Sequence, residues 1–240
     1  MRRFIDLHLR QPAGSSDELE LMLRFAADLG WGGVAVASDG GQLGRLKGLG
    51  EELGLDVISR VDLRPRGARE LRASLRRVRR RFEIVAVCCR SKAVARQAAR
   101  DHRVDLLNFS PSPSTRNRAW FDRQEASLAS GASCAYEINV SDLLGLGPAA
   151  GAKLLSIIRR EIENARDHGV PVATSSGADS RLLMREPRGL AALLDLVGVG
   201  EEEGLEMVSS IPWGIVEVNR GKLSPGFIAP GVRVVEEGAG

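Results

Sequence analysis

The sequence predicts an α/β protein, a (β/α) barrel of the TIM type in which seven or eight parallel strands are ringed by helices. Seven short apolar runs rich in Val, Ile and Ala alternate with helical segments, the pattern of a parallel sheet covered by helices. These units recur about every thirty residues, the spacing of βα units. The 240 residues suit a closed barrel, and no G-x-G-x-x-G or G-x-x-x-x-G-K-S/T motif follows a strand.

The opening stretch, residues 4–10, alternates apolar and polar side chains in the period of a strand. We expect Phe4, Asp6, His8 and Arg10 to share one face, opposite Ile5, Leu7 and Leu9. A carboxylate and an imidazole two residues apart on one face are able to hold a divalent metal, so Asp6 and His8 are a candidate vestigial metal site. A hydrogen-bonded polar pair in the barrel mouth is the favoured alternative.

The remaining elements follow in order. Further strands are predicted over residues 31–37, 55–61, 83–88, 104–109, 133–140 and 170–175. Helices are predicted over residues 16–30, 39–53, 68–81, 91–101, 117–130, 153–167, 189–198 and 201–210, with capping residues at Ser15 and Ser16 and a terminating Gly54. The last unit leaves little room for an eighth strand. Residues 1–221 are therefore predicted to form one barrel domain, and residues 222–240 its extended C-terminal arm, which either packs on the barrel, the slightly favoured outcome, or docks on a partner's sheet edge.

Composition bounds the cellular setting. The three cysteines, Cys88, Cys89 and Cys134, form no C-x-x-C pair, so neither a disulfide framework nor a structural zinc site is indicated. No apolar stretch approaches the roughly 20 residues of a membrane span. We expect a cytoplasmic protein without a membrane partner.

The C-terminal ends of barrel strands carry the working residues of this fold. Reading those ends gives His8 and Arg10, Ser38 and Asp39, Asp62 and Arg64, Arg90 and Lys92, Asn108 and Ser110, Asn139 and Ser141, and Ser175, Ser176 and Asp179. A hydrolytic metal site needs several histidines and carboxylates, yet this set contains a single histidine. We therefore expect no bound metal and no catalytic residue in this chain.

Two motifs carry a family resemblance. The start D-L-H-x-R resembles the D-x-H-x-H motif of polymerase-and-histidinol-phosphatase (PHP) phosphoesterases with Arg10 in place of the second histidine, and T-S-S-G-A-D at residues 174–179 is similar to their later S-D-A-H segment without its histidine. A PHP-like barrel with a lost metal cage is typical of the thirty-kilodalton ribonuclease P protein family, known in archaea as ribonuclease P protein component 3. Residues 172–199 and 223–235 resemble that family most specifically.

The resemblance implies a protein subunit of ribonuclease P, the ribonucleoprotein endonuclease that removes the 5′ leader from precursor tRNA. It implies that the RNA holds the catalytic Mg²⁺, so that this chain carries no cofactor of its own. Its partners would be the ribonuclease P RNA, protein component 2 and the other ribonuclease P proteins, with precursor tRNA contacted only indirectly.

The basic residues favour an RNA-binding surface, because 30 of them are arginines and 4 are lysines and arginine grips phosphates in pairs; arginine codons in a GC-rich genome are the alternative cause. The candidate RNA-binding residues lie at the strand ends: Arg10, Arg64, Arg90, Lys92, Arg116, Arg118, Arg181, Arg185 and Arg188. A second basic face is predicted opposite the apolar stripe of helix 68–81: Arg69, Arg72, Arg76, Arg79 and Arg80. With 4% aromatic residues, recognition of backbone and shape is favoured over base stacking.

Two other functions stay open. A divergent metal-dependent PHP-type phosphoesterase is the main alternative, and it requires Asp6 and His8 to belong to a working metal site. A small-molecule barrel enzyme with Asp62 or Asp39 as base rests on the fold alone.

Overall fold

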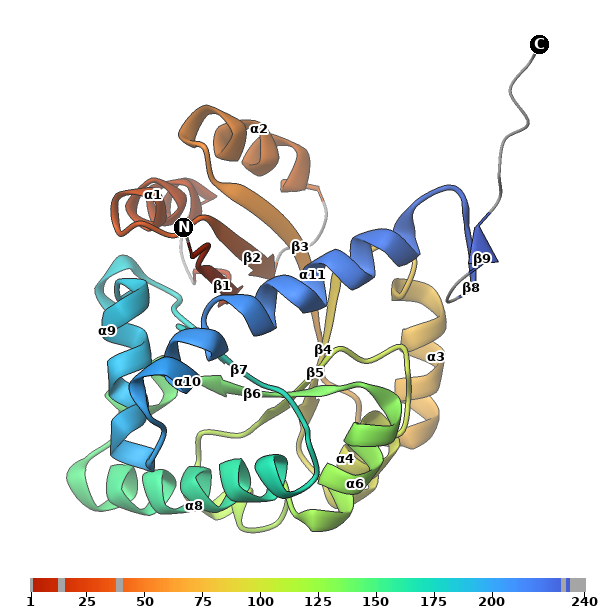
Figure 1. Cartoon of the computed structure of the whole chain (residues 1–240), viewed down its shortest axis with the longest axis vertical. Helices are drawn as coiled ribbons and strands as arrows, with labels where there is room; N and C mark the ends of the chain where they lie inside the picture. The colour runs from red at the N-terminus through yellow and green to blue at the C-terminus, as the bar shows by residue number, and fades with distance from the viewer. Residues whose placement is uncertain (1, 13–15, 38–40, 230–231, 234–240) are drawn as a thin grey trace.

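A computed structural model describes residues 2–12, 16–37, 41–229 and 232–233. Its centre is a seven-stranded sheet in which every pairing is parallel and the strands follow in chain order (Figure 1). The strands are β1 (Ile5–Leu9), β2 (Gly33–Ala37), β3 (Asp56–Leu63), β4 (Ile84–Cys89), β5 (Leu106–Phe109), β6 (Ala135–Asn139) and β7 (Val172–Ser175). Leu9 and Ala178 form a parallel bridge that joins the two edges, and the amide of Arg10 donates to the carbonyl of Ala178 at 2.8 Å. The predicted barrel is confirmed, with seven strands in the described part of the chain.

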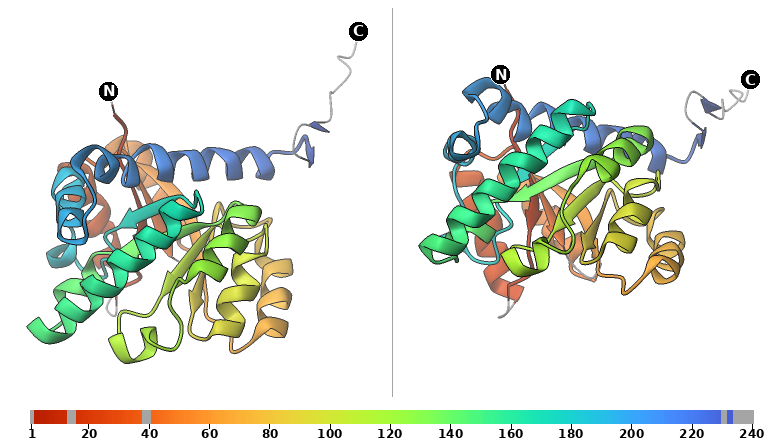
Figure 2. Two further views of the ribbon diagram at one scale, coloured as in Figure 1. Left: turned by 60° about the horizontal axis from the view of Figure 1, so that its bottom comes forward. Right: turned by 90° about the horizontal axis from the view of Figure 1, so that it is seen from below.

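Helices surround the sheet (Figures 1 and 2). They are α1 (Ser16–Asp28), α2 (Leu43–Leu53), α3 (Ala68–Val78), α4 (Lys92–Ala99), α5 (Pro113–Arg116), α6 (Arg123–Ala132), α7 (Ser141–Leu144), α8 (Pro148–Asp167), α9 (Pro187–Ala192), α10 (Glu201–Met207) and α11 (Ser210–Leu223), with 3₁₀ turns η1 (Arg181–Leu183) and η2 (Leu193–Val197). In the described residues no helix is long and apolar enough to cross a membrane.

Several helices differ from the sequence prediction: the short α5 and α7 were not expected, and three longer helices differ for clear reasons. The helix expected over 117–130 begins only at Arg123, because Asp122 and Glu125 form a capping box that starts α6 there. Helix α8 begins at Pro148, earlier than expected, since proline is well tolerated in the first helical position. Helix α11 was not predicted, because its proline and glycines lower its helix propensity.

Helix α11 closes the end of the barrel where the strands begin. Its Val216 packs into the interior cluster formed by Ile5 and Leu7 of β1 with inward residues of the other strands. Arg220 of the same helix donates to Asp56 at 2.7 and 2.9 Å and to Glu83 at 2.6 Å. Because this end is filled by a helix, the opposite end is the barrel's mouth.

The chain beyond α11 forms a small hairpin. Strands β8 (Phe227–Ala229) and β9 (Val232–Arg233) pair antiparallel, and β8 contacts the end of α11. The two strands lie at the far end of α11, away from the barrel strands (Figure 2). Of the predicted arm over residues 222–240, positions 230–231 and 234–240 fall outside the described residues.

Candidate functional site

The first strand departs from simple alternation. Ile5 and Leu7 lie in the barrel interior, whereas Leu9 packs outside against helices α1 and α2. The pairing of β1 with β2 shifts register within this strand, so His8 also turns into the mouth. Its ring nitrogens lie 2.7 Å from Oδ1 of Asn139 and 2.9 Å from Oδ2 of Asp62. The prediction that His8 lies on the face opposite Leu7 is therefore wrong.

A buried arginine organises the mouth. Arg60, wholly buried on β3, donates from both terminal nitrogens to Glu137 at 2.6 and 2.7 Å. Its Nε donates to Asp62 at 2.9 Å, and Nη1 also donates to the carbonyl of Leu7 at 2.5 Å. The sequence signal for this residue is its period-two spacing between Ile58 and Asp62, which puts all three side chains inside the barrel.

Both carboxylates beside Arg60 are held ionised. Burial raises the pKa of Glu137 and of Asp62, but the positive charge of Arg60, its hydrogen bonds and the nearby His8 together outweigh burial and lower both pKa values. Glu137 additionally accepts from Asn108 at 3.0 Å and from Ser175 at 2.8 Å. The carboxylates are thus fully engaged within the protein.

These side chains do not fit a metal ion. Both ring nitrogens of His8 are engaged in hydrogen bonds within the protein. Glu137 and Asp62 each form an ion pair with Arg60. In the ranges the structure describes, no group of three or more His, Cys, Asp or Glu side chains is arranged to hold a metal. The guanidinium supplies the charge balance that a bound cation supplies in a metal site.

Asp6 lies at the seam between β1 and β7. Its Oδ1 accepts from the amides of His8 at 3.1 Å and Ser176 at 2.9 Å, while Oδ2 has no hydrogen-bond partner in the described structure. Burial raises the pKa of this carboxyl, and these hydrogen bonds oppose the rise. Asp6 therefore contacts its candidate partner His8 through the backbone amide and not through the imidazole. By accepting from Ser176 as well, Asp6 links β1 to the segment after β7.

Arg116 is a correction to the predicted RNA-binding set. It is only 4% exposed, and its guanidinium pairs with Glu161 and donates to the hydroxyl of Tyr136 at 2.5 Å. It also donates to the carbonyls of Phe109 and Ser110 at 3.2 Å. Because all of these partners are inside the protein, Arg116 is not a surface residue able to meet a phosphate.

The ammonium group of Lys92 is likewise engaged with partners within the protein. Its Nζ donates to the carbonyl of Trp120 at 2.8 Å, to Asp122 at 2.6 Å and to Glu125 at 2.9 Å. Burial and a hydrogen bond with Asp122 raise the pKa of Glu125 to about 7, against the opposing effect of Lys92. Of the four candidates that follow β4 and β5, namely Arg90, Lys92, Arg116 and Arg118, only Arg90 and Arg118 are exposed.

The predicted arginines around β7 lie in separate environments. Arg10 pairs with Asp142 at 2.8 Å, and Arg181 pairs with Glu18 of α1 at 3.2 Å. Arg185 donates to the backbone carbonyls of Leu182 and Met184. Exposed Arg188 lies over the ring of Phe4, 6.0 Å from its centroid. Arg10 contacts the segment after β6 and does not join the other three.

Helix α3 and its flanking segments form a positively charged surface, which we call the α3 basic face. Its exposed arginines are Arg64, Arg66, Arg69, Arg72, Arg76, Arg77, Arg80 and Arg81. None of their guanidinium groups has a carboxylate within 4.0 Å in the described residues, although the backbone amide of Arg66 donates to Glu70 at 3.0 Å. Arg72 and Arg77 donate to the neutral side chains of Gln97 and Ser74.

Arg79 is the exception among the arginines predicted for this face. Its side chain is 14% exposed and donates to Asp105 at 2.5 Å and to three backbone carbonyls. The helix turns it toward β5, because it follows the apolar positions Leu75 and Leu71 by one and two turns, respectively.

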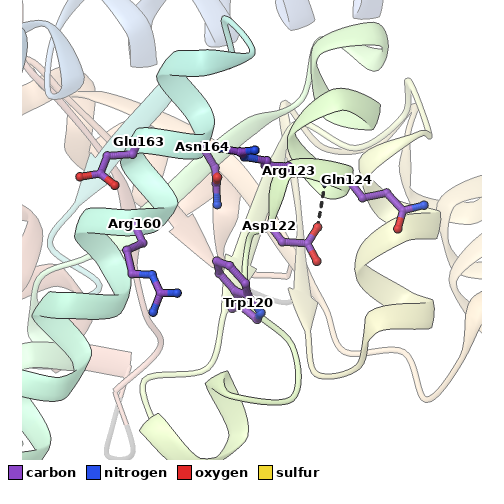
Figure 3. A pocket seen from close by; sticks show the side chains of 7 residues that line it. All are labelled: Trp120, Asp122, Arg123, Gln124, Arg160, Glu163 and Asn164. Atoms are coloured by element: carbon purple, nitrogen blue, oxygen red, sulfur yellow. Dashed lines mark hydrogen bonds between the residues drawn. The ribbon is translucent and has the colours of Figure 1, made fainter.

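A hollow beside Trp120 was not found from the sequence. It lies between α6 and α8, has a volume of about 530 Å³ and is shown in Figure 3. Its lining residues are Trp120, Asp122, Arg123, Gln124, Arg160, Glu163 and Asn164. The only sequence signal is a tryptophan in a loop between two arginines, Arg118 and Arg123, and it does not reveal the contribution of α8.

Comparison with known proteins identifies relatives over the whole barrel. The model of the family described as RNase P subunit p30 matches residues 3–223. The ribonuclease P protein component 3 of Methanosarcina mazei is 26% identical over 97% of this chain and 96% of its own. That of Methanosarcina acetivorans is 28% identical over 94% of this chain and 92% of its own.

Solved structures agree on the fold. A chain in the cryo-EM structure of archaeal ribonuclease P with mature tRNA superposes with a TM-score of 0.81, at 22% identity, covering 98% of this chain and all of that one. Ochratoxinase from A. niger superposes with a TM-score of 0.61 at 12% identity, over 91% of this chain and 71% of its own. The barrel fold is thus shared with ochratoxinase as well.

Proposed function

The chain belongs to the RNase P subunit p30 family, and from this membership we propose that it is a non-catalytic, RNA-binding subunit of ribonuclease P. As a family member it is a protein subunit of the endoribonuclease that processes tRNA. The proposal concerns what it contributes there, namely a positively charged surface for the enzyme's RNA.

The α3 basic face is the observation that carries the proposal. Like charges three or four residues apart on a helix repel one another by a few tenths of a kcal/mol per pair. Arg69, Arg72 and Arg76 are spaced in this way and have no carboxylate partner in the described residues. An RNA backbone would neutralise them and release bound counterions, which strengthens binding. Arg90 and Arg118 add exposed positive charge on the side of the strand ends, where Arg64 of the α3 basic face also lies.

The barrel mouth supports a role without chemistry in this chain. Hydrolysis by a PHP-type site needs metal-bound water, and Arg60 occupies the carboxylates that would hold a metal. Asp62, considered as a general base, is equally engaged with Arg60 and His8. Asp39, the other carboxylate considered, lies outside the described residues. We therefore assign the catalytic Mg²⁺ to the RNA partner.

The partners follow from the same proposal. The structural neighbour with the TM-score of 0.81 belongs to an archaeal ribonuclease P solved with mature tRNA. By analogy, this chain would bind the ribonuclease P RNA together with protein component 2 and other ribonuclease P proteins, in the cytoplasm, and would meet precursor tRNA only through that assembly.

Reconstitution tests the function. The purified chain alone should cleave neither precursor tRNA nor a phosphate ester, and it should raise the activity of ribonuclease P RNA when added with component 2. Measured initial rates of 5′ leader removal give the comparison. Turnover of a phosphodiester by the chain alone with Mn²⁺ or Zn²⁺, abolished by His8→Ala, would establish the phosphoesterase alternative instead.

A further inference from the structure

Trp120 is held rigidly at the surface. Its carbonyl accepts from Lys92, and the next residue, Phe121, donates its amide to Glu161 at 3.0 Å and accepts from Asn164 at 2.9 Å. The indole itself is only partly buried and makes no hydrogen bond through Nε1 with the described residues. By contrast Trp31 is buried and donates to the carbonyl of Arg185 at 3.0 Å.

Hollows open beside this indole. The larger one, of about 530 Å³, lies between α6 and α8, and a smaller one of about 190 Å³ adjoins it along α5 and α8. Trp120 and Arg160 line both. Figure 3 shows Trp120 between Asp122 on one side and Arg160 on the other. The combined space is in the size range of pockets that hold a small organic ligand.

The positive charges around the indole are in part unused. The guanidinium carbon of Arg160 is 5.6 Å from the ring centroid, and Nζ of Lys92 is 5.4 Å from it. Lys92 is neutralised by Asp122 and Glu125, but Arg160 and Arg123 are exposed and have no carboxylate within 4.0 Å in the described residues. An aromatic face and two unpaired guanidinium groups thus meet in one hollow.

We propose that this hollow binds one unstacked nucleotide of single-stranded RNA, with its base stacked on Trp120 and its phosphate contacted by Arg123. The inference rests on the proposed function, because the RNA would be that of ribonuclease P. A base between Trp120 and Arg160 needs two stacking contacts of roughly 3.5 Å each, so Arg160 swings outward by about 1.5 Å from its present distance of 5.6 Å.

The lining chemistry favours a nucleotide over a protein side chain. Apart from the indole, every residue that lines the larger hollow is polar or charged. A protein hot spot buries an aromatic or aliphatic anchor among apolar walls, which this hollow lacks. A nucleotide supplies an aromatic face, hydrogen-bonding edges and a phosphate together. One tryptophan is able to stack on one base. The site would therefore add a single base contact to RNA binding that otherwise depends on the phosphate backbone.

Intrinsic fluorescence of the full-length chain tests the site directly. A single-stranded oligoribonucleotide of about eight residues should quench the emission of Trp120, whereas a duplex of the same length should not. The Trp120→Leu variant should lose the quenching and bind the single strand about 5- to 100-fold more weakly. Arg160→Gln should also weaken binding, and Arg159→Gln, which removes the neighbouring exposed charge outside the hollow, should not.

The outcomes separate this inference from the proposed function. Equal oligonucleotide affinity of the wild type and Trp120→Leu, in a protein that still stimulates ribonuclease P RNA, overturns the nucleotide site and leaves the proposed function intact. Loss of component 2 binding by Trp120→Leu, with unchanged oligonucleotide affinity, also overturns it and makes the hollow a protein contact. A chain that neither binds nor stimulates the RNA contradicts the proposed function itself. Matching thermal unfolding of the variants shows that each is folded.

Discussion

Arg60 is the residue that neutralises the carboxylates of Glu137 and Asp62 in the barrel mouth. Its guanidinium is wholly buried and balances Glu137, which is also buried, and Asp62. Desolvating three charged groups is costly, and their mutual contacts offset that cost only while the set is complete. Such a buried ion set adds little net stability to the fold, but removal of any one member leaves an uncompensated buried charge.

Replacement of Arg60 by methionine should therefore destabilise the protein strongly. Glu137 and Asp62 would be left buried beside one another, and the free energy of unfolding should fall by about 3–5 kcal/mol. Urea unfolding followed by circular dichroism measures the loss, with Arg159→Met on the surface as the control, expected within about 0.5 kcal/mol of wild type.

Adding Glu137→Gln to the Arg60→Met variant should restore part of the stability, because one uncompensated charge is removed. This double variant also covers the case in which Arg60→Met fails to fold. A loss below about 1 kcal/mol in the single variant would contradict the assignment of Arg60 as the central ion of the mouth.

The sequence did not reveal which arginines are buried in ion pairs and which are exposed. The position of Arg116 after a strand was predictable, but its partner Glu161 lies 45 residues further along the chain on another element. Arg60 and Glu137 are 77 residues apart in the same way. Whether an arginine meets a carboxylate or solvent depends on such long-range neighbours, so the sequence alone suggested a larger RNA-binding set than the structure exposes.

At the scale of elements, α3 is an amphipathic helix whose apolar side packs against the barrel. Leu71 and Leu75 are fully buried against the barrel, and the arginines project from the remaining surface. Since the apolar stripe fixes the rotation of the helix, the charge pattern outside is fixed as well. The helix is thus a rigid support for phosphate contacts.

Replacing Arg69, Arg72 and Arg76 together by glutamine should weaken RNA binding and flatten its dependence on salt. For every phosphate that is no longer bound, the slope of log affinity against log salt becomes shallower by about one unit. Filter binding or fluorescence anisotropy over a series of salt concentrations measures both quantities with the ribonuclease P RNA.

The matched control replaces Arg2, Arg45 and Arg166, which are already paired with Glu202, Glu20 and Glu203. It changes the net charge equally and should leave the slope close to that of wild type. Equal slopes for the two triple variants would remove α3 from the RNA interface.

The strands were predictable and α11 was not, for one physical reason. Each barrel strand is a run of apolar residues whose burial is evident locally, as in the V-A-V of β2. Helix α11 contains Pro212 and Gly214, and it is stabilised mainly by Val216 entering the barrel and by Arg220 reaching β3 and the start of β4. Its stability lies in tertiary contacts that a local pattern does not contain.

On the scale of the whole molecule, the barrel is fastened differently at its two ends. The mouth is held by the buried set around Arg60, which is shielded from solvent. The opposite end is held by Arg220 on Asp56 and Glu83, and there the side chains of Arg220 and Asp56 are 36% and 18% exposed. Since screening and protonation act mainly on accessible groups, the end closed by α11 should respond first to acid.

The sign of that response follows from the two carboxylates. Burial raises the pKa of Asp56 and of Glu83, but hydrogen bonds and positive charges, Arg220 prominent among them, lower both pKa values below their ordinary values. A carboxylate whose pKa is lower in the folded state binds fewer protons there than in the unfolded chain. Its contribution to stability is present above the ordinary pKa and disappears as the pH falls.

Arg220→Met should therefore be less stable than wild type at pH 7 and should lose less further stability on acidification. Urea unfolding at a series of pH values between about 7 and 3 gives the two curves, which should converge toward acid as Asp56 and Glu83 become protonated. Arg3 and Lys47 also face these carboxylates, so the slope is reduced and not abolished. Arg166→Met, which breaks a pair with the more exposed Glu203, should stay close to wild type throughout. Parallel curves for wild type and Arg220→Met would show that α11 is held by its apolar contacts alone.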